Sequence, residues 1–249
     1  MKQTKRYADY DGFAKIYNSH WGPSYGAKAI PLLKKLLLDG IPKSAKILDL
    51  CCGSGHITRE LLDEGYAVTG IDGSGNLLEY AKQNAPGVRF ILADVRHFQL
   101  DDMFDAVVSL NDSLNHIMSL EELIDVFRNV KSSLNLGGWF LFDLNLAYKY
   151  ETSWTGSFAV VEDDIVCAVR ANTHMTKRVA EFAATIFEPE NTVWIRKDIT
   201  LYQTWYQVTN IVKSLEDGGF YDIVVLNKNA KILLDDFQTD KAYFKCRKG

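Results

Sequence analysis

The first 145 residues alternate between short apolar runs and amphipathic stretches, and this alternation constrains the fold more than any other feature. Strands joined by helices of this kind form a parallel sheet with helices on its faces. The expected strands are Lys46–Leu50, Ala67–Asp72, Val88–Asp94, Phe104–Leu110 and Trp139–Asn145. The expected helices are Ala27–Asp39, His56–Glu64, Leu77–Asn84 and Leu120–Leu134. The last of these begins with a capping box, Ser119 followed by Glu122.

The pattern changes after the fifth strand. Four β-like runs between Ser153 and Gln203, separated by polar turns, predict an antiparallel meander. The α/β pattern then returns with a helix at Gln207–Glu216 and two strands at Tyr221–Leu226 and Lys241–Arg247. We therefore expect one domain over residues 1–249 that carries a β-rich insertion at 151–203.

Composition narrows the class of protein. The chain has 28 basic and 32 acidic residues, a net charge of −4, which gives no general attraction for nucleic acid. Its longest apolar segment, residues 30–38, is too short to cross a membrane. The four cysteines lack the spacing of a zinc site and fit free thiols in the cytoplasm. We expect no metal, no membrane and no nucleic-acid partner.

The segment Ile47–His56, ILDLCCGSGH, joins a strand to a helix through a loop that contains two glycines. Glycines at such a loop let a ligand approach the backbone, and the helix start adds free N–H groups. A dinucleotide site would need a third small residue, but Thr58 occupies that position. A nucleotide-dependent oxidoreductase and a non-catalytic cofactor-binding protein are the alternatives at this point.

Polar residues also leave the ends of the next three strands. Asp72 ends the second strand and can accept both ribose hydroxyls of an adenosine. Asp94 ends the third strand, and a carboxylate there can accept an adenine amino group beside Val95. The fourth strand runs into the polar segment 110–116. Ligands of open α/β sheets bind at these strand ends.

With these segments, the chain resembles the class I S-adenosylmethionine-dependent methyltransferases, in particular small-molecule enzymes of the type 11 and type 12 kind. The matching segments are ILDLCCGSG at 47–55, VTGIDGS at 68–74, ILADVR at 91–96, FDAVVSLNDSLNHI at 104–117 and LNLGGWFLFDLN at 134–145. The family motif D-x-G-x-G-x-G has a glycine where this chain has Cys51. That departure implies altered packing near the methionine part of the cofactor.

The resemblance implies a Rossmann-like α/β fold: a seven-stranded, mostly parallel sheet with an antiparallel last strand, helices on both faces and the inserted meander. It implies S-adenosylmethionine as cofactor and S-adenosylhomocysteine as product. Asp49 to Gly55 would surround the methionine part, Asp72 would hold the ribose, and Asp94 with Val95 would hold adenine. The full set of expected cofactor contacts is Tyr17, Trp21, Asp49, Cys51, Cys52, Gly53, Gly55, Ile57, Asp72, Gly73, Leu77, Ala93, Asp94, Val95, Leu110 and Asn111.

The N-terminal segment, residues 1–26, resembles the Y-D-x-x-A-x-x-Y lid of small-molecule methyltransferases. It is rich in aromatic and polar side chains, namely Tyr10, Asp11, Phe13, Tyr17, Asn18, His20, Trp21 and Tyr25. Tyr17, and then Trp21, are the preferred contacts to the cofactor. The alternative is a helix that packs an aromatic stripe on the core, and the two interpretations are compatible.

The expected reaction is methyl transfer to a nitrogen or oxygen of a small-molecule acceptor, with RNA or protein methylation as the alternative. We expect His116, with Asp112 or Asn115, to orient or deprotonate the acceptor; the alternative is that His116 caps a turn. In the insertion, alternate residues from Trp194 to Tyr202 share one strand face. That face either roofs the acceptor pocket or pairs with a second subunit in a homodimer.

Overall fold

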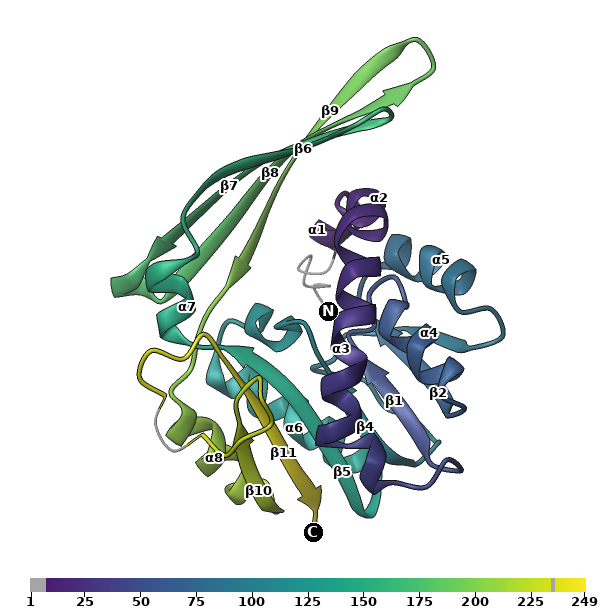
Figure 1. Ribbon diagram of the computed structural model, residues 1–249, viewed down its shortest axis with the longest axis vertical. Helices are drawn as coiled ribbons and strands as arrows, with labels where there is room; N and C mark the ends of the chain where they lie inside the picture. Colours follow the sequence, from purple (N-terminus) through teal and green to yellow (C-terminus); the bar gives the residue numbers. More distant parts are fainter. Residues whose placement is uncertain (1–7, 234–235) are drawn as a thin grey trace.

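The computed structural model describes residues 8–233 and 236–249 (Figure 1). The first seven residues of the expected 1–26 lid therefore lie outside the described residues. Within the described part, no helix combines the length and apolar character needed to cross a membrane.

A seven-stranded sheet forms the body, in the order β10-β11-β5-β4-β1-β2-β3. Among the described strands of this sheet, β11 alone runs antiparallel to its neighbours, β10 and β5. The predicted Rossmann-like fold is therefore confirmed, including the antiparallel last strand. The strands are β1 Lys46–Leu50, β2 Ala67–Asp72, β3 Arg89–Leu92, β4 Phe104–Ser109, β5 Leu134–Asn145, β10 Phe220–Leu226 and β11 Lys241–Lys248.

Helices cover both faces of this sheet, as expected. On one face, Leu33 and Leu61 from α3 and α4 pack on strand residues such as Ile47. On the other face, Phe127 of α6 and Ile211 of α8 pack on a second apolar cluster. The longer helices are α3 Gly22–Leu36, α4 His56–Asp63, α5 Gly75–Asn84, α6 Leu120–Ser133 and α8 Val208–Asp217.

The predicted cap of α6 is present. The Ser119 hydroxyl accepts a hydrogen bond from the Glu122 N–H at 3.2 Å. The Glu122 carboxylate pairs with Arg96, whose side chain is buried, at 2.5 Å. The acidic residue of the box therefore also ties α6 to the loop after β3.

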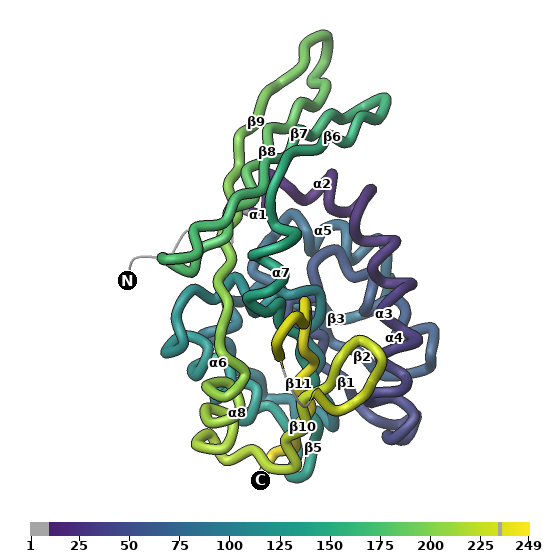
Figure 2. The backbone as a smooth tube through the Cα atoms, turned by 60° about the vertical axis from the view of Figure 1, so that its left-hand side comes forward, coloured from purple at the N-terminus to yellow at the C-terminus, as the bar shows by residue number. Residues whose placement is uncertain are grey.

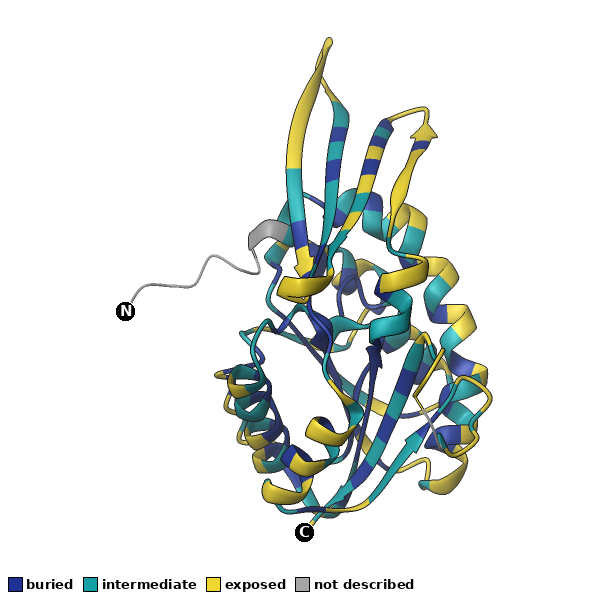
Figure 3. Ribbon diagram, turned by 90° about the vertical axis from the view of Figure 1, so that its left-hand side faces the viewer, coloured by how far each residue is buried: buried dark blue, intermediate teal, exposed yellow. Residues whose placement is uncertain are grey.

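The insertion forms a separate four-stranded antiparallel sheet in the order β6-β7-β8-β9. It stands above the carboxyl ends of the body strands, and its outer tip is exposed (Figures 1 and 3). The strands are β6 Gly156–Glu162, β7 Ile165–His174, β8 Val179–Glu190 and β9 Val193–Gln203. A short helix that the sequence did not predict, α7 Ala147–Thr152, connects β5 to this sheet.

The N-terminal segment lies between the insertion and the body (Figure 2). It consists of α1 Ala8–Asp11, α2 Ala14–Ile16 and a π turn at Tyr17–Trp21. Phe13 and Ile16 are buried in one apolar cluster with insertion residues such as Cys167 and Ile186. The segment and the insertion therefore form one packed unit over the strand ends.

Candidate functional site

The loop after β1 is shaped by left-handed backbone. Gly53 has φ 54° and Gly55 has φ 76°, values that glycine adopts without strain. A Cβ on Gly55 would lie 3.0 Å from Ala81, so close packing against α5 also requires a glycine here. Cys51 has φ 61° as well. Cysteine therefore stands at a backbone position that favours glycine, the residue found there in the family motif.

Asp72, at the end of β2, hydrogen-bonds to both the loop after β1 and the loop after β2. Its Oδ2 accepts the Gly53 N–H at 2.8 Å, and its Oδ1 accepts the Ser74 N–H at 2.8 Å. Burial raises the pKa of Asp72 to about 6, although these backbone donors oppose the rise. Each carboxylate oxygen keeps a lone pair for a further donor. A buried carboxylate prepared in this way suits a ligand with two adjacent hydroxyls.

Asp72 lines a first cavity of about 530 Å³ at the strand ends. Seven of the expected cofactor contacts lie together in its wall. The lining residues are Tyr10, Tyr17, Cys51, Gly53, Asp72, Gly73, Leu77, Asn111, Ser113 and His116.

A second cavity, of about 340 Å³, lies beside the first. Asp49 is buried in its wall, where its Oδ2 accepts the Thr58 hydroxyl at 2.5 Å. Burial raises the pKa of Asp49 to about 7. The lining residues are Tyr17, Gly22, Tyr25, Gly26, Asp49, Cys51, Cys52, Ser54, His56, Ile57, Leu110, Asn111 and Ser113.

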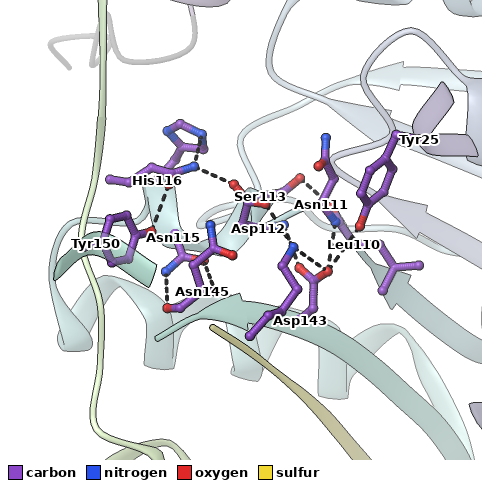
Figure 4. Close-up of polar contacts among 12 residues, drawn as sticks. Tyr25, Leu110, Asn111, Asp112, Ser113, Asn115, His116, Asp143, Asn145 and Tyr150 are labelled. Carbon is purple, nitrogen blue, oxygen red and sulfur yellow. Dashed lines mark hydrogen bonds and ion pairs between the residues drawn. The ribbon is translucent and has the colours of Figure 1, made fainter. Parts of the chain in front are cut away.

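The loop after β4 is held by Asp143 from β5 (Figure 4). Asn111 and Asp112 both have left-handed backbone, with φ 64° and 49°. The Asp143 carboxylate accepts the N–H of Asp112 at 2.6 Å, the N–H of Asn111 at 3.2 Å and the Tyr25 hydroxyl at 3.2 Å. Asp143 thus compensates an unfavourable turn with hydrogen bonds and projects Asn111 and Asp112 toward the cavities.

Lys241 of β11 lies between two carboxylates. Its Nζ is 3.0 Å from Asp112 Oδ1 and 3.0 Å from Asp143 Oδ2. Burial raises the pKa of Asp143. Burial also opposes ionisation of Asp112, but Lys241 and Gln203 outweigh it and lower the pKa of that carboxyl. Asp112 is therefore ionised at neutral pH.

Among the described residues, His116 makes polar contacts with three residues from other elements. Its Nδ1 is 2.7 Å from the carbonyl oxygen of Tyr202, which can only accept, so Nδ1 carries the proton. Its Nε2 is 2.6 Å from the Tyr10 hydroxyl and 3.1 Å from the Gln203 amide nitrogen. Tyr150 donates to the Gln203 amide oxygen at 2.8 Å, which turns the amide nitrogen toward His116. These contacts leave the lone pair of His116 on Nε2, as a base requires.

A third cavity, of about 890 Å³, lies under the insertion. It shares Tyr10, Tyr17, Asn111 and His116 with the first cavity. Its lining residues are Tyr10, Phe13, Tyr17, Trp21, Ser24, Tyr25, Asn111, Asp112, His116, Trp154, Phe182, Leu201 and Gln203.

Trp21, an expected cofactor contact, lies in this third cavity. Its ring stacks on Phe13 with centroids 5.1 Å apart and meets Phe182 of the insertion edge-on at 6.2 Å. Tyr17 lines all three cavities, and its hydroxyl accepts a hydrogen bond from Asn111 at 3.0 Å. Of the two expected lid contacts, the structure brings Tyr17 beside Gly53 and places Trp21 further out.

The strand face from Trp194 to Tyr202 does not line the third cavity; the alternate residues Leu201 and Gln203 do. Trp194 and Tyr202 are half exposed. The face that carries Trp194 and Tyr202 therefore points away from the third cavity, because the register of β9 turns the opposite face inward.

The loop after β3 is arranged around Arg96. Asp94 accepts from the Arg96 guanidinium at 2.6 Å, and Arg96 is itself buried. Val95 is buried in the apolar core, and the Ala93 N–H donates to the Asp72 carbonyl at 3.0 Å. Ala93, Asp94 and Val95 do not line the three cavities described above.

Sequence reasoning did not assign roles to Asp143, Gln203 or Lys241. One signal was available for Asp143, a single acid inside the apolar run Phe140–Leu144. Gln203 and Lys241 come from elements 91 and 129 residues away from Asp112, and no local pattern marks them. Within the described ranges, no group of three or more His, Cys, Asp or Glu side chains could hold a metal ion.

Comparison with known proteins agrees with this geometry. The sequence family described as a methyltransferase domain matches residues 47–138. The putative methyltransferase YqeM of Bacillus subtilis (strain 168) is 28% identical over 251 residues, covering 96% of this chain and 97% of its own. A dTDP-3-amino-3,6-dideoxy-alpha-D-glucopyranose N,N-dimethyltransferase of Streptomyces fradiae is 32% identical over 120 residues, 47% of each chain.

Among solved structures, an S-adenosylmethionine-dependent methyltransferase from Clostridium acetobutylicum ATCC 824 has the same fold. The TM-score is 0.77 at 22% identity, over 96% of this chain and 99% of that chain. The chain thus carries a methyltransferase domain over residues 47–138 and has the fold of an S-adenosylmethionine-dependent methyltransferase.

The residues present fit such a cofactor. Asp72 offers a carboxylate to two ribose hydroxyls, and at Gly53 a side chain would enter the space beside Tyr17, with its Cβ 3.4 Å from the ring. The first and second cavities meet at Tyr17, Cys51 and Asn111, so together they can take a nucleoside with an amino-acid tail.

Proposed function

We propose that this enzyme transfers the methyl group of S-adenosylmethionine to a nitrogen or oxygen of a small-molecule acceptor and releases S-adenosylhomocysteine. One observation carries the proposal: the cavity that contains Asp72 and the third cavity share four lining residues. A cofactor in one and an acceptor in the other would therefore meet at Tyr10, Tyr17, Asn111 and His116. The third cavity is lined mainly by aromatic and apolar side chains with a few polar groups, as small-molecule sites are.

In this proposal, the first cavity holds the adenosine part, with the ribose on Asp72 beside Gly73 and Leu77. The second cavity holds the methionine part, against Asp49, Cys51 and the loop that follows. Cys52, Gly53, Gly55, Ile57 and Leu110 complete this wall. When bound, S-adenosylmethionine supplies an electrophilic sulfonium methyl. Contacts of adenine with Ala93, Asp94 and Val95 stay a prediction.

His116 and Tyr10 form the proposed proton path. Tyr10 donates its hydroxyl proton to Nε2 of His116 and keeps oxygen lone pairs that face the shared wall. Burial raises the pKa of Tyr10 well above its usual range, so the hydroxyl is neutral before the reaction. A proton leaving the acceptor can pass to the Tyr10 oxygen while the Tyr10 proton moves to His116. Asp112, linked to His116 through the Gln203 amide nitrogen, favours the resulting imidazolium.

The test is a screen of small amines and hydroxy compounds with S-adenosylmethionine, in which release of S-adenosylhomocysteine is measured. On an accepted substrate, we expect His116→Ala to lower kcat by about 100-fold, the usual contribution of a general base. Tyr10→Phe should lower it less, because a water molecule can replace the hydroxyl. The exposed His97→Ala is the matched control. Unchanged turnover by His116→Ala would remove the proposed base.

The alternatives have distinct outcomes. An RNA or protein methyltransferase would be inactive on all small molecules but would label a macromolecule. A non-catalytic binder would hold the cofactor without turnover on any acceptor. Four further expectations stay predictions. They are action in the cytoplasm, absence of a nucleic-acid partner, a homodimer formed through the insertion, and a single domain in which residues 1–26 act as a lid.

A further inference from the structure

The lysine, arginine and carboxylate side chains of the molecule are unevenly represented in the described lining of the three cavities, where only carboxylates occur. Among the described residues that line them there is no lysine or arginine, whereas Asp49, Asp72 and Asp112 contribute carboxylates. Lys241 lies behind Asp112 and is shared with Asp143. The group of two carboxylates and one ammonium has a net charge of about −1 when all are ionised. An anion entering the third cavity would meet the Asp112 carboxylate and no lysine or arginine among the described lining residues.

The outer part of the third cavity is aromatic. Phe13, Trp21 and Phe182 contact one another, and Trp154 lies 6.3 Å from Phe182 between ring centroids. Leu201 adds an aliphatic wall. These side chains offer dispersion contacts and electron-rich ring faces. The Trp154 indole N–H already donates to the Glu181 carbonyl oxygen. The side chains of this outer part suit an apolar body, planar or alicyclic.

The inner part of the same cavity is polar and gathers hydrogen-bond acceptors. Asp112 retains lone pairs beyond those used by Lys241 and Gln203, and the Tyr10 oxygen can accept as well. Both lie at the wall shared with the first cavity or next to it. A group with several N–H donors is the natural complement to this end.

We propose that the methyl acceptor is a primary or secondary amine carried on an apolar body, and that Asp112 selects the amine in its cationic form; this rests on the proposed function. The amine lies at Asp112, and the body lies among Trp21, Trp154 and Phe182. Nucleotide-linked and carboxylate acceptors are disfavoured, because a diphosphate or carboxylate finds no cationic side chain in the described lining.

The chemistry balances without a further reactant. The bound ammonium first loses a proton through Tyr10 and His116, which exposes the nitrogen lone pair. That pair forms the new N–C bond as the C–S bond breaks, and the bonding electrons return to sulfur. The products are the N-methylated amine, a neutral thioether and protons released to solvent.

The experiment uses the full chain saturated with S-adenosylhomocysteine and three probes of equal length: 3-phenylpropylamine, 3-phenylpropanol and 3-phenylpropionate, with thymidine diphosphate as a fourth. Binding is followed by calorimetry and by quenching of tryptophan fluorescence, because Trp21 and Trp154 line the cavity. We expect the amine to bind at least tenfold more tightly than the carboxylate. Asp112→Asn should weaken the amine roughly tenfold and leave the alcohol unchanged.

Exposed Asp101→Asn is the matched control, and it should alter none of these affinities. The inference is overturned if the amine binds no more tightly than the carboxylate or the nucleotide, and also if none of the probes binds. It is likewise overturned by an Asp112→Asn variant that retains the wild-type preference for the amine while still binding S-adenosylhomocysteine. Failure of the wild-type chain to bind S-adenosylhomocysteine would instead overturn the proposed function.

Discussion

Replacing Lys241 with methionine tests how the site loop is held. The ammonium makes two ion pairs at 3.0 Å, with Asp112 and Asp143, and Asp143 is fully buried. Removing one partner of a buried pair leaves uncompensated charge, which typically costs about 3–5 kcal/mol. Methionine keeps the length of the side chain, so packing changes little. We expect Lys241→Met to lose about 3–5 kcal/mol of unfolding free energy at pH 8.

The loss should depend on pH. Without the ammonium, Asp112 and Asp143 repel each other, and the folded state retains a proton on one of them with a raised pKa. A carboxyl whose folded pKa exceeds its unfolded pKa stabilises the fold at low pH, and this contribution is lost as pH rises through the raised value. The deficit of Lys241→Met relative to wild type should therefore be smaller at pH 5 than at pH 8.

Urea denaturation at both pH values measures this directly. Lys245→Met is the matched control, since Lys245 lies on the same face of β11 but stacks on Trp139 with its ammonium 4.1 Å from the ring centroid. The double variant Lys241→Met/Asp143→Asn should recover part of the loss. A loss for Lys241→Met no larger than that for Lys245→Met, or independent of pH, would refute the electrostatic reasoning.

Three further predictions concern the cofactor site. Asp11→Ala removes the carboxylate that accepts from the Ser74 hydroxyl at 2.5 Å. S-adenosylmethionine should then dissociate about tenfold faster in stopped-flow experiments, which corresponds to a loss of ~1.4 kcal/mol. An unchanged dissociation rate would show that this contact does not retain the cofactor. Burial raises the pKa of Asp72 to about 6 and that of Asp49 to about 7, so both carboxyls ionise between pH 5 and pH 8. Affinity for the cationic S-adenosylmethionine should therefore rise over this range, and affinity for the uncharged thioether of S-adenosylhomocysteine should rise less. Equal dependence of the two affinities on pH, measured by calorimetry, would contradict this. Gly55→Ala, at φ 76°, should lower the unfolding free energy by about 2 kcal/mol in thermal melts, whereas Gly40→Ala, which meets no atom within 4 Å, should not.

The body of the fold could be predicted because its signals are local. The expected bounds of β1 and β2 agree with the structure, since each is a short apolar run that ends beside a polar loop. The strand β5 is longer than expected, beginning at Leu134, because Gly137 at φ 73° and a register shift continue pairing with β4 through a segment that resembles a turn. The helix α7 was missed because six residues rich in tyrosine show no helical period.

The site was predictable only where it follows strand ends. Asp72 ends β2, and Asn111 and His116 both follow β4, so the topology brings them together at the same edge of the sheet. Asp143 and Lys241 contribute through pairing of β5 with β11, a contact between segments about a hundred residues apart. Which face of β9 turns inward depends on its register with β8, and alternation alone leaves both faces open.

The most direct test of the account is calorimetric titration of the full chain with S-adenosylmethionine and S-adenosylhomocysteine, alongside Asp72→Ala and the control Asp101→Ala. Two ribose hydroxyls bonded to a carboxylate are worth about 3 kcal/mol or more, so Asp72→Ala should weaken both ligands by at least about 100-fold. Asp101→Ala should bind as the wild type does. Absence of binding in the folded wild-type chain, or unchanged affinity in Asp72→Ala, would contradict the assignment of this cavity to the cofactor.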